Sequence, residues 1–397
     1  MRQMKDSGIP WIGQMPTNWN CERGKFIFRY VQKPIRDDDG VITCFRDGEV
    51  TLRSNRREEG FTMADKEIGY QGIDVGDLVV HGMDGFAGAI GISDSRGKAS
   101  PVLNVLDTNQ CKRYFMYYLR SMAFSNVFVA TATGIRVRSC DLRWNKLAEF
   151  RYPLPPIAEQ HRIADFLDKK CAEIDSLTAD VQKEIETLQE YRRSLITEAV
   201  TECEAPYVRF KYCASVKSNL VAPDNYMNYP QVSPETIEKD TGRLLKDAVC
   251  SVEDSGIISG NHLFFKGQIL YSKIRPILNK VTIAPFDGLC SADMYPIETV
   301  NDSHYIMYAM LSKDFLRQVK SVTENRVKMP KINQEELADI RIHLPSIADQ
   351  HRIADFLDKK CAEIDSILET KQKQLETLAE YRKSLIYEYV TGKKEVV

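Results

Sequence analysis

The sequence predicts a mixed α/β protein in which two globular domains are joined by two long helices. Three observations lead to this fold class: a duplication at an offset of 190 residues, an apolar stripe at helical spacing in each duplicated segment, and short strand patterns broken by glycine turns elsewhere. The length of 397 residues agrees, because a single hydrophobic core rarely serves more than about 250–300 residues. A tandem duplication of one unit also predicts a pseudo-twofold molecule.

The duplication divides the chain into four parts. The letters QHRIADFLDKKCAEIDS occur at 160–176 and again at 350–366, and 154–201 matches 344–391 at 35 of 48 positions without a gap. Further back in the same register, Arg136 aligns with Arg326 and Tyr118 with Tyr308. The segments between the copies differ far more. We expect globular domains at 1–151 and 203–341, and helical spacers at 152–202 and 342–397.

Each spacer is predicted to be one long helix with an apolar seam. Ten positions of the first copy step by four and three residues, and eight of them are apolar or aromatic. They are Ile163, Leu167, Lys170, Ile174, Leu177, Val181, Glu184, Leu188, Tyr191 and Leu195. The second copy gives Ile353, Leu357, Lys360, Ile364, Ile367, Lys371, Gln374, Leu378, Tyr381 and Leu385.

Proline before both segments and Gly392 after the second are helix start and stop signals. A helix of roughly 40–45 residues is about 60–67 Å long and cannot bury its seam alone. The two helices are therefore expected to pack on each other, antiparallel, with one globular domain at each end. The alternative is a pair of ordinary bundle helices inside one domain.

The globular parts are predicted to be mixed α/β. Residues 73–80 and 263–271 are typical of a strand, a glycine turn and a strand, whereas 114–130 and 304–319 have helical spacing. Both parts contain many polar loops, where variable recognition surfaces usually lie.

Composition excludes several classes of protein. Hydrophobic residues make up 43%, charged residues 28%, and mean hydropathy is -0.35, as in ordinary globular proteins. We expect a cytoplasmic protein without a membrane partner, because no apolar run of membrane or signal-peptide type occurs. Ten scattered cysteines without a C-x-x-C pair argue against a zinc ribbon or a disulfide scaffold. Net charge is -2 overall but +4 over 1–151, which is compatible with DNA binding through local patches.

A search for catalytic and metal-binding motifs finds none. The Walker phosphate loop, G-x-G-x-x-G after a strand, H-E-x-x-H, G-x-S-x-G and the N/D-P-P-Y/F motif of amino-methylases are all missing. The six histidines show no ligand spacing, and no catalytic or metal residue is predicted. His161 and His351 stand at the starts of the repeated helices, where helix-start packing and contact with a partner are both open.

Basic and amide side chains in polar loops are the candidate DNA contacts. Arginine and lysine neutralise phosphates, and arginine and asparagine can also recognise base edges. A charged loop is often only a solvated face, but here patches recur at matching places in both copies. In the first domain they are Arg53, Asn55, Arg56, Arg57, Arg136 and Arg138, with Arg143 and Lys146 nearby. In the second they are Lys273, Arg275, Asn279, Lys280, Asn325, Arg326 and Lys328, with Lys331 nearby.

The chain resembles the specificity subunit of type I restriction-modification systems over nearly its whole length. Three features carry the resemblance: MKDSGIPWIGQMPTNW at 4–19, the twice-used L-P-x-I-A-x-Q-H-R-I-A-D-F-L-D at 154–168 and 344–358, and GQILYSKIRP at 267–276 with Asn279 and Lys280. The resemblance implies that each globular domain is a target-recognition domain reading half of a split double-stranded DNA site.

The resemblance also implies partners. These are two modification subunits with adenine methyltransferase activity and S-adenosylmethionine, and two motor-nuclease restriction subunits using ATP and magnesium. This chain itself would be the non-catalytic reader and hold no cofactor. The repeated helix starts, with His161, Phe166, His351 and Phe356, fall in the constant regions that the family associates with this assembly.

Two physical expectations follow for such a reader. Two domains on a rigid rod meet the same face of DNA about one turn apart, roughly 34 Å, which predicts an unread spacer. Unlike domains predict unlike half-sites. A coiled-coil scaffold or interaction protein without DNA function is the alternative, and a single-chain restriction-modification enzyme is disfavoured by the missing motifs.

Overall fold

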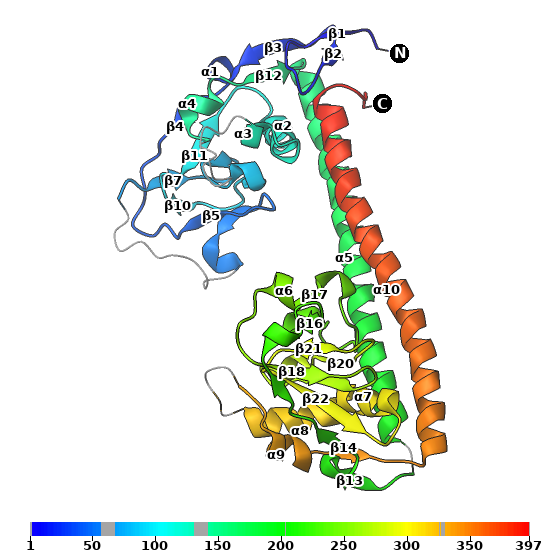
Figure 1. Ribbon diagram of the computed structural model, residues 1–397. Helices are drawn as coiled ribbons and strands as arrows, with labels where there is room; N and C mark the ends of the chain where they lie inside the picture. The colour runs from blue at the N-terminus through cyan, green and yellow to red at the C-terminus, as the bar shows by residue number, and fades with distance from the viewer. Residues whose placement is uncertain are drawn as a thin grey trace. The chain divides into compact units, whose positions relative to one another are not determined.

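The computed structural model describes residues 2–56, 68–130, 142–202, 204–324, 326 and 330–396 (Figure 1). The chain forms two compact units, of which unit 1 contains 1–180 and 374–397 and unit 2 contains 181–373. Each unit therefore takes one globular part and one half of each long helix. The predicted mixed α/β class with two long helices is confirmed. Across the described residues, every helix is too short or too polar to cross a membrane.

Unit 1 is built on a four-stranded sheet in the order β4-β11-β8-β9, with smaller two-stranded pairs around it. Its strands are β1 (Met4–Asp6), β2 (Gln14–Pro16), β3 (Asn20–Arg23), β4 (Arg29–Val31), β5 (Ile42–Cys44), β6 (Val50–Leu52), β7 (Gln71–Ile73), β8 (Leu78–His81), β9 (Ile90–Ile92), β10 (Gly97–Ala99), β11 (Leu103–Asp107) and β12 (Arg151–Leu154). Its short helices are α1 (Gly24–Ile27), η1 (Arg53–Asn55), η2 (Gly85–Ala87), α2 (Lys112–Phe124), α3 (Val127–Ala130) and α4 (Trp144–Leu147).

Unit 2 repeats this sheet as β14-β22-β19-β20 and adds a second sheet in the order β15-β18-β21-β16-β17. Its strands are β13 (Tyr207–Arg209), β14 (Ala214–Val216), β15 (Leu220–Val221), β16 (Pro230–Val232), β17 (Cys250–Ser251), β18 (Asn261–Phe264), β19 (Ile269–Ser272), β20 (Val281–Ile283), β21 (Gly288–Cys290), β22 (Met294–Thr299) and β23 (Arg341–His343). Its short helices are η4 (Phe210–Tyr212), η5 (Pro223–Asn225), η6 (Pro234–Thr236), η7 (Lys246–Ala248), α6 (Val252–Ser255), η8 (Pro276–Leu278), α7 (Ser303–Leu311), α8 (Lys313–Thr323) and α9 (Gln334–Asp339).

The long helices α5 (Ile157–Thr201) and α10 (Ile347–Val390) run antiparallel. In unit 1 an ion pair of 3.3 Å joins Asp175 of α5 to Arg382 of α10. In unit 2 an ion pair of 2.5 Å joins Glu184 to Lys371. Residue numbers therefore rise along one helix as they fall along the other, as the sequence predicts.

The predicted seam is wrong at several positions. Leu177 and Tyr191 are 52% and 54% exposed, and their counterparts Ile367 and Tyr381 are 45% and 54% exposed. The buried apolar positions of α5 are Ile163, Ala164, Leu167, Cys171, Ile174, Val181, Ile185, Ile196 and Val200. Each helix packs against a globular domain as well as against the other helix. The buried face is therefore wider than a heptad stripe and keeps the 3.6-residue helical period.

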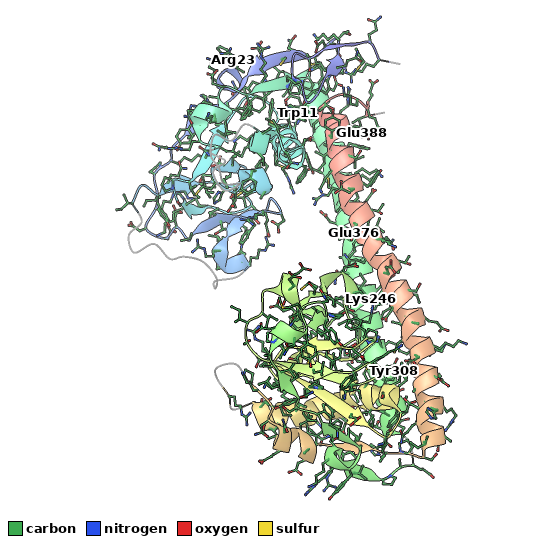
Figure 2. The ribbon with its side chains drawn as sticks, in the orientation of Figure 1. Trp11, Arg23, Lys246, Tyr308, Glu376 and Glu388 are labelled. Atoms are coloured by element: carbon green, nitrogen blue, oxygen red, sulfur yellow. The ribbon has the colours of Figure 1, made fainter. Side chains whose placement is uncertain are left out.

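The first and last segments of the chain pack together in the core of unit 1. Trp11, labelled in Figure 2, lies with its ring centroid 5.5 Å from Tyr118 and 6.0 Å from Tyr387 near the end of α10. Gly392 ends this helix with φ +73°, and a Cβ at that position would lie 2.4 Å from a ring carbon of Pro16. Unit 1 is therefore closed by the last residues of the chain.

Candidate nucleic-acid interface

A turn after the central strand of each four-stranded sheet recurs in both units. In unit 1, β8 is followed by η2 and β9. In unit 2, β19 is followed by η8 and β20. The residue that ends each short helix has a left-handed backbone, with φ +98° at Gly88 and φ +44° at Asn279. Glycine and asparagine are the residues that adopt this conformation most readily. The two turns are therefore equivalent elements of the two units and carry different side chains.

Each turn is fastened by the segment that follows the second basic patch of its domain. The Leu142 backbone N–H donates to the Gly82 carbonyl at 2.8 Å, and the Ile332 N–H donates to the Lys273 carbonyl at 3.0 Å. In unit 2 the Arg275 N–H also donates to the Pro330 carbonyl at 2.8 Å. The structure thus brings residues 273–275 together with residues 330–332, which follow more than 50 residues later in the chain.

Most basic candidates of unit 2 are held by the protein itself. The Lys273 ammonium lies 5.4 Å from the Tyr295 ring centroid. Lys280 donates to the Pro234 carbonyl at 2.6 Å, and Arg326 pairs with Glu336. These contacts hold the cations in place and reduce the capacity of each to bind a nucleic acid.

Two candidates of unit 2 differ from these. Asn279 is 1% exposed, and neither polar atom of its side chain has a hydrogen-bond partner among the described residues. Arg275 is exposed, and no contact of its guanidinium with another described residue is found. Asn325 and Lys328 lie outside the described residues. Arg275 is therefore the candidate of this unit that is placed on the surface without a protein partner in the described structure.

The described candidates of unit 1 follow β6. Arg53 Nε donates to Thr43 Oγ1 at 3.3 Å, and Asn55 Nδ2 donates to Thr51 Oγ1 at 2.9 Å. Arg56 forms ion pairs with Asp47 at 2.5 Å and Glu49 at 3.1 Å.

Burial on its own raises the pKa of Asp47, but the hydrogen bond from Arg56 reverses this and the pKa lies below its usual value. The charge of Arg56 is therefore balanced within the domain. Arg57, Arg136 and Arg138 lie outside the described residues.

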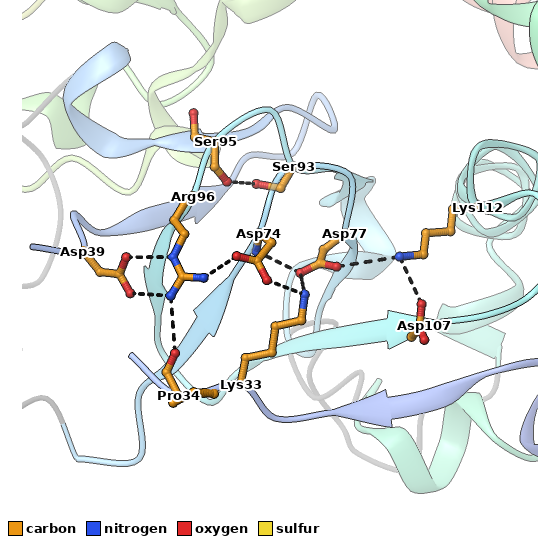
Figure 3. A network of polar contacts seen from close by, with 10 residues as sticks. All are labelled: Lys33, Pro34, Asp39, Asp74, Asp77, Ser93, Ser95, Arg96, Asp107 and Lys112. Atoms are coloured by element: carbon orange, nitrogen blue, oxygen red, sulfur yellow. Dashed lines mark hydrogen bonds and ion pairs between the residues drawn. The ribbon is translucent and has the colours of Figure 1, made fainter. Parts of the chain in front are cut away.

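A chain of ion pairs braces the sheet region of unit 1 (Figure 3). Lys33 pairs with Asp74 at 2.8 Å and with Asp77 at 2.6 Å. Arg96 pairs with Asp74 and with Asp39, whose Oδ1 lies 3.1 Å from Arg96 Nε. These residues come from the loops around β4, β5, β7, β8 and β10. The network therefore adds side-chain links between loops that backbone hydrogen bonds also join, such as the bond from the Gly72 N–H to the Lys33 carbonyl at 2.9 Å.

The network lowers the pKa of Asp39 and Asp74. Burial alone raises the pKa of Asp39, but hydrogen bonds from the Arg36 backbone and from Arg96 outweigh it, so the pKa lies below the usual 3.8. The hydrogen bond from Lys33 is the largest cause of the lowered pKa of Asp74. Both carboxylates are stabilised in their charged form by folding.

We expect unit 1 to lose stability as the pH falls through about 4. A carboxyl whose folded pKa is below its unfolded pKa stabilises the fold above the unfolded value, here 3.8, and loses this contribution as pH falls through the folded value. Asp39→Ala should lower the free energy of unfolding by about 2 kcal/mol at pH 7 and make stability depend less on pH. Urea unfolding followed by hydrogen exchange at several pH values measures both effects. Asp38→Ala, which removes the exposed neighbouring carboxylate, should leave stability and its pH dependence unchanged.

The base of each long helix carries a duplicated hydrogen-bond cluster. Gln160 is 0% exposed; its Oε1 accepts from the Cys111 N–H at 3.0 Å and its Nε2 donates to the Pro155 carbonyl at 2.8 Å. Gln350 is 1% exposed and makes the matching bonds to Asp302 N–H at 3.1 Å and to the Pro345 carbonyl at 2.9 Å. The cluster fastens each helix to its own globular domain.

A second pair of contacts corrects the alignment of the two domains. Tyr117 donates to Asp168 at 2.8 Å, and Tyr308, labelled in Figure 2, donates to Asp358 at 2.7 Å. Tyr117 is therefore the counterpart of Tyr308, and the alignment of Tyr118 with Tyr308 is wrong by one residue. The offset is 191 residues in this part of the domains and 190 in the helices.

The family model for the type I restriction modification DNA specificity domain matches residues 211–377. The EcoDI specificity subunit of a type I restriction enzyme from Escherichia coli is 30% identical over 298 residues, which are 66% of this chain and 66% of that protein. The chain belongs to the family of type I restriction-modification specificity subunits.

More distant relatives cover nearly the whole of this specificity subunit. A putative MjaX specificity subunit from Methanocaldococcus jannaschii is 22% identical over 428 residues, spanning 97% of this chain and 96% of that protein. A solved chain described under complex assembly and conformational transition of the type I R-M system has a TM-score of 0.72 at 12% identity, covering 96% of this chain and 99% of its own. The HsdS subunit from Thermoanaerobacter tengcongensis has a TM-score of 0.51 at 13% identity, covering 96% and 98%. Both solved chains share the fold of this specificity subunit.

The partner-binding candidates of this specificity subunit have different surroundings in the two units. Both His161 and His351 are exposed, but His351 Nδ1 also lies 2.6 Å from Asp302 Oδ2. The Phe166 ring is partly buried and packs on Tyr389 of α10, with ring centroids 4.4 Å apart. Phe356 is 45% exposed. Contact of these four residues with a partner stays a prediction.

Gln160, Gln350, Asp168 and Asp358 are important residues that sequence reasoning did not single out. All four lie in the repeated letters, so identity between the copies was the available signal. The described residues contain no group of three or more His, Cys, Asp or Glu side chains able to hold a metal ion.

Proposed function

We propose that this specificity subunit reads a bipartite, asymmetric DNA site, with each globular domain recognising one half. The observation that carries the proposal is the pair of matching turns on one repeated sheet framework, each fastened by the segment that follows the second basic patch of its domain. The shared framework provides two equivalent recognition surfaces. The segments that carry these surfaces differ far more between the two copies than the helices do, which favours two different half-sites.

The chain directs chemistry that its partners perform. In this proposal, two methyltransferase subunits with S-adenosylmethionine methylate adenine at the site, and two motor-nuclease restriction subunits with ATP and magnesium cleave unmodified DNA. The chain contributes no catalytic residue and acts in the cytoplasm. Two nearly identical helix starts, anchored by Gln160 and Gln350, offer two similar docking surfaces for the methyltransferase subunits.

Single-molecule methylation sequencing tests the proposal. Cells that produce the chain together with its cognate methyltransferase subunit should carry a split adenine motif, and cells that produce either protein alone should not. The two halves of the motif should differ in sequence. A demonstrably assembled complex that leaves no motif would instead favour the coiled-coil scaffold.

A further inference from the structure

Arg275 has a backbone conformation that arginine rarely adopts. Its φ and ψ are +44° and +53°, in the left-handed region. The other non-glycine residues of the described chain with positive φ are Asn126, Asp240 and Asn279, whose short polar side chains tolerate this region. Arg275 also precedes Pro276, and a residue before proline normally prefers an extended backbone. The conformation is strained and must be imposed by the surroundings.

The matching turn of unit 1 shows that the framework does not demand this strain. The counterpart of Arg275 is Asp84, at the same position before the short helix, and its φ is -99°. The counterpart of Asn279 is Gly88, which shares the positive φ. The left-handed residue after the short helix therefore belongs to the turn, whereas the one before it is particular to unit 2.

Contacts on both sides hold Arg275 in place. Its N–H donates to the Pro330 carbonyl at 2.8 Å, and its own carbonyl accepts from the Leu278 N–H at 2.9 Å. Pro276 is buried, and Ile274 forms a β-bridge with Lys331. The backbone is therefore fixed, and the exposed guanidinium extends from a rigid base.

The described cations nearby are already engaged. Lys280 is bound to the Pro234 carbonyl, Lys331 pairs with Asp293 at 3.0 Å, and Arg326 pairs with Glu336. The 202–341 segment has 17 basic and 18 acidic side chains, so it has no excess positive charge to attract DNA. A guanidinium on a rigid turn that no described residue pairs with therefore matters more here than it would in a basic domain.

Unit 1 also places an arginine at the same turn. Asp84 holds Arg46 through an ion pair of 2.9 Å, and the Arg46 side chain is 60% exposed. Two domains with unlike surfaces thus share an arginine at this place. A group that both domains need, whatever bases they read, is suited to a phosphate, because phosphates are the same in every DNA sequence.

We propose that the Arg275 guanidinium binds a phosphate of the DNA backbone and so positions the second domain on its half-site. The proposal rests on the proposed function and adds the class of contact. Bidentate pairing of a planar guanidinium with a phosphate is strong and depends on orientation, which a rigid base preserves. The local strain is the cost of that orientation.

Arg275→Gly in the complex of the full chain with its methyltransferase subunit tests this. Affinity for all DNA sequences should fall by about tenfold, the slope of log affinity against log salt should become shallower by about 0.9, and the methylated motif should keep its letters. Arg275→Lys should retain part of the affinity. Glycine also relieves the left-handed strain, so the melting temperature should rise by about 2–4 °C.

A control variant separates the role of Arg275 from a general loss of positive charge. Arg317→Ala removes an arginine whose side chain is 77% exposed and paired with Asp314. It should leave DNA affinity unchanged.

A motif relaxed at one base in Arg275→Gly would overturn the phosphate assignment in favour of base recognition. Unchanged affinity, or a lower melting temperature, would also overturn it. A wild-type complex that directs no methylation would instead contradict the proposed function itself.

Discussion

Gln160→Leu is expected to destabilise unit 1 by about 2–5 kcal/mol. Leucine has a similar volume but leaves the buried Cys111 N–H and Pro155 carbonyl without partners, and each such group costs about 1–3 kcal/mol. The base of α5 should then separate from its domain more often. Urea unfolding measures the loss of stability, and faster hydrogen exchange at the Cys111 amide reports the lost hydrogen bond.

The duplication supplies the control for this prediction. Gln350→Leu should speed exchange at the Asp302 amide of unit 2 and leave Cys111 protected, whereas Gln160→Leu should do the reverse. Gln182→Leu changes an exposed glutamine of α5 and should affect neither amide. Protection of Cys111 that is unchanged in Gln160→Leu would show that the helix base is held by other contacts.

Trp19→Ala is the second variant for which we expect a large effect. It should lower the free energy of unfolding by about 3–5 kcal/mol. Trp19 is 0% exposed, its Nε1 donates to Glu159 Oε2 at 3.1 Å, and its ring meets Tyr114 edge-on at 6.4 Å. A Cβ on Gly392 would lie 3.0 Å from this ring, so the tryptophan also supports the end of α10. The large cavity should loosen both the first turn of α5 and the last turn of α10.

Hydrogen exchange resolved by segment checks this outcome. Residues 374–396 should lose protection together with the first domain, while 207–343 should keep theirs. Trp144→Ala is the matched control, because Trp144 is only partly buried and stacks on Tyr30 at 6.3 Å. Trp144→Ala should lower the free energy of unfolding much less than Trp19→Ala. Equal losses in the two variants would contradict a special role for Trp19.

The duplication and the long helices were predictable because their signals are local. Repeated letters need no structure to be recognised, and proline and glycine mark where each helix begins and ends. The predicted seam of each long helix was partly wrong because the burial of a side chain depends on which part of the protein packs against it. Leu177 and Tyr191 have the right spacing and chemistry for a seam, yet they face solvent, since the helix turns a different side to its domain.

The sequence indicates which regions carry candidate DNA contacts, but not which of their side chains have partners within the protein. Arg56 and Arg326 look alike in sequence to Arg275, but acidic partners engage the first two. The strain at Arg275 depends on the Pro330 carbonyl, which lies 55 residues further along the chain. The shift from Tyr118 to Tyr117 was hidden for a similar reason, since two diverged domains no longer show where one residue was inserted.

The way the chain ends close unit 1 also sets an order of events during synthesis. Unit 2 is one continuous stretch, 181–373, whereas unit 1 needs 374–397 as well as 1–180. Lys393 donates to the Ile12 carbonyl at 2.9 Å, so this contact forms only after residue 393 has been synthesised. Of the two units, unit 1 is begun first and completed last, because all of unit 2 is made between its two segments.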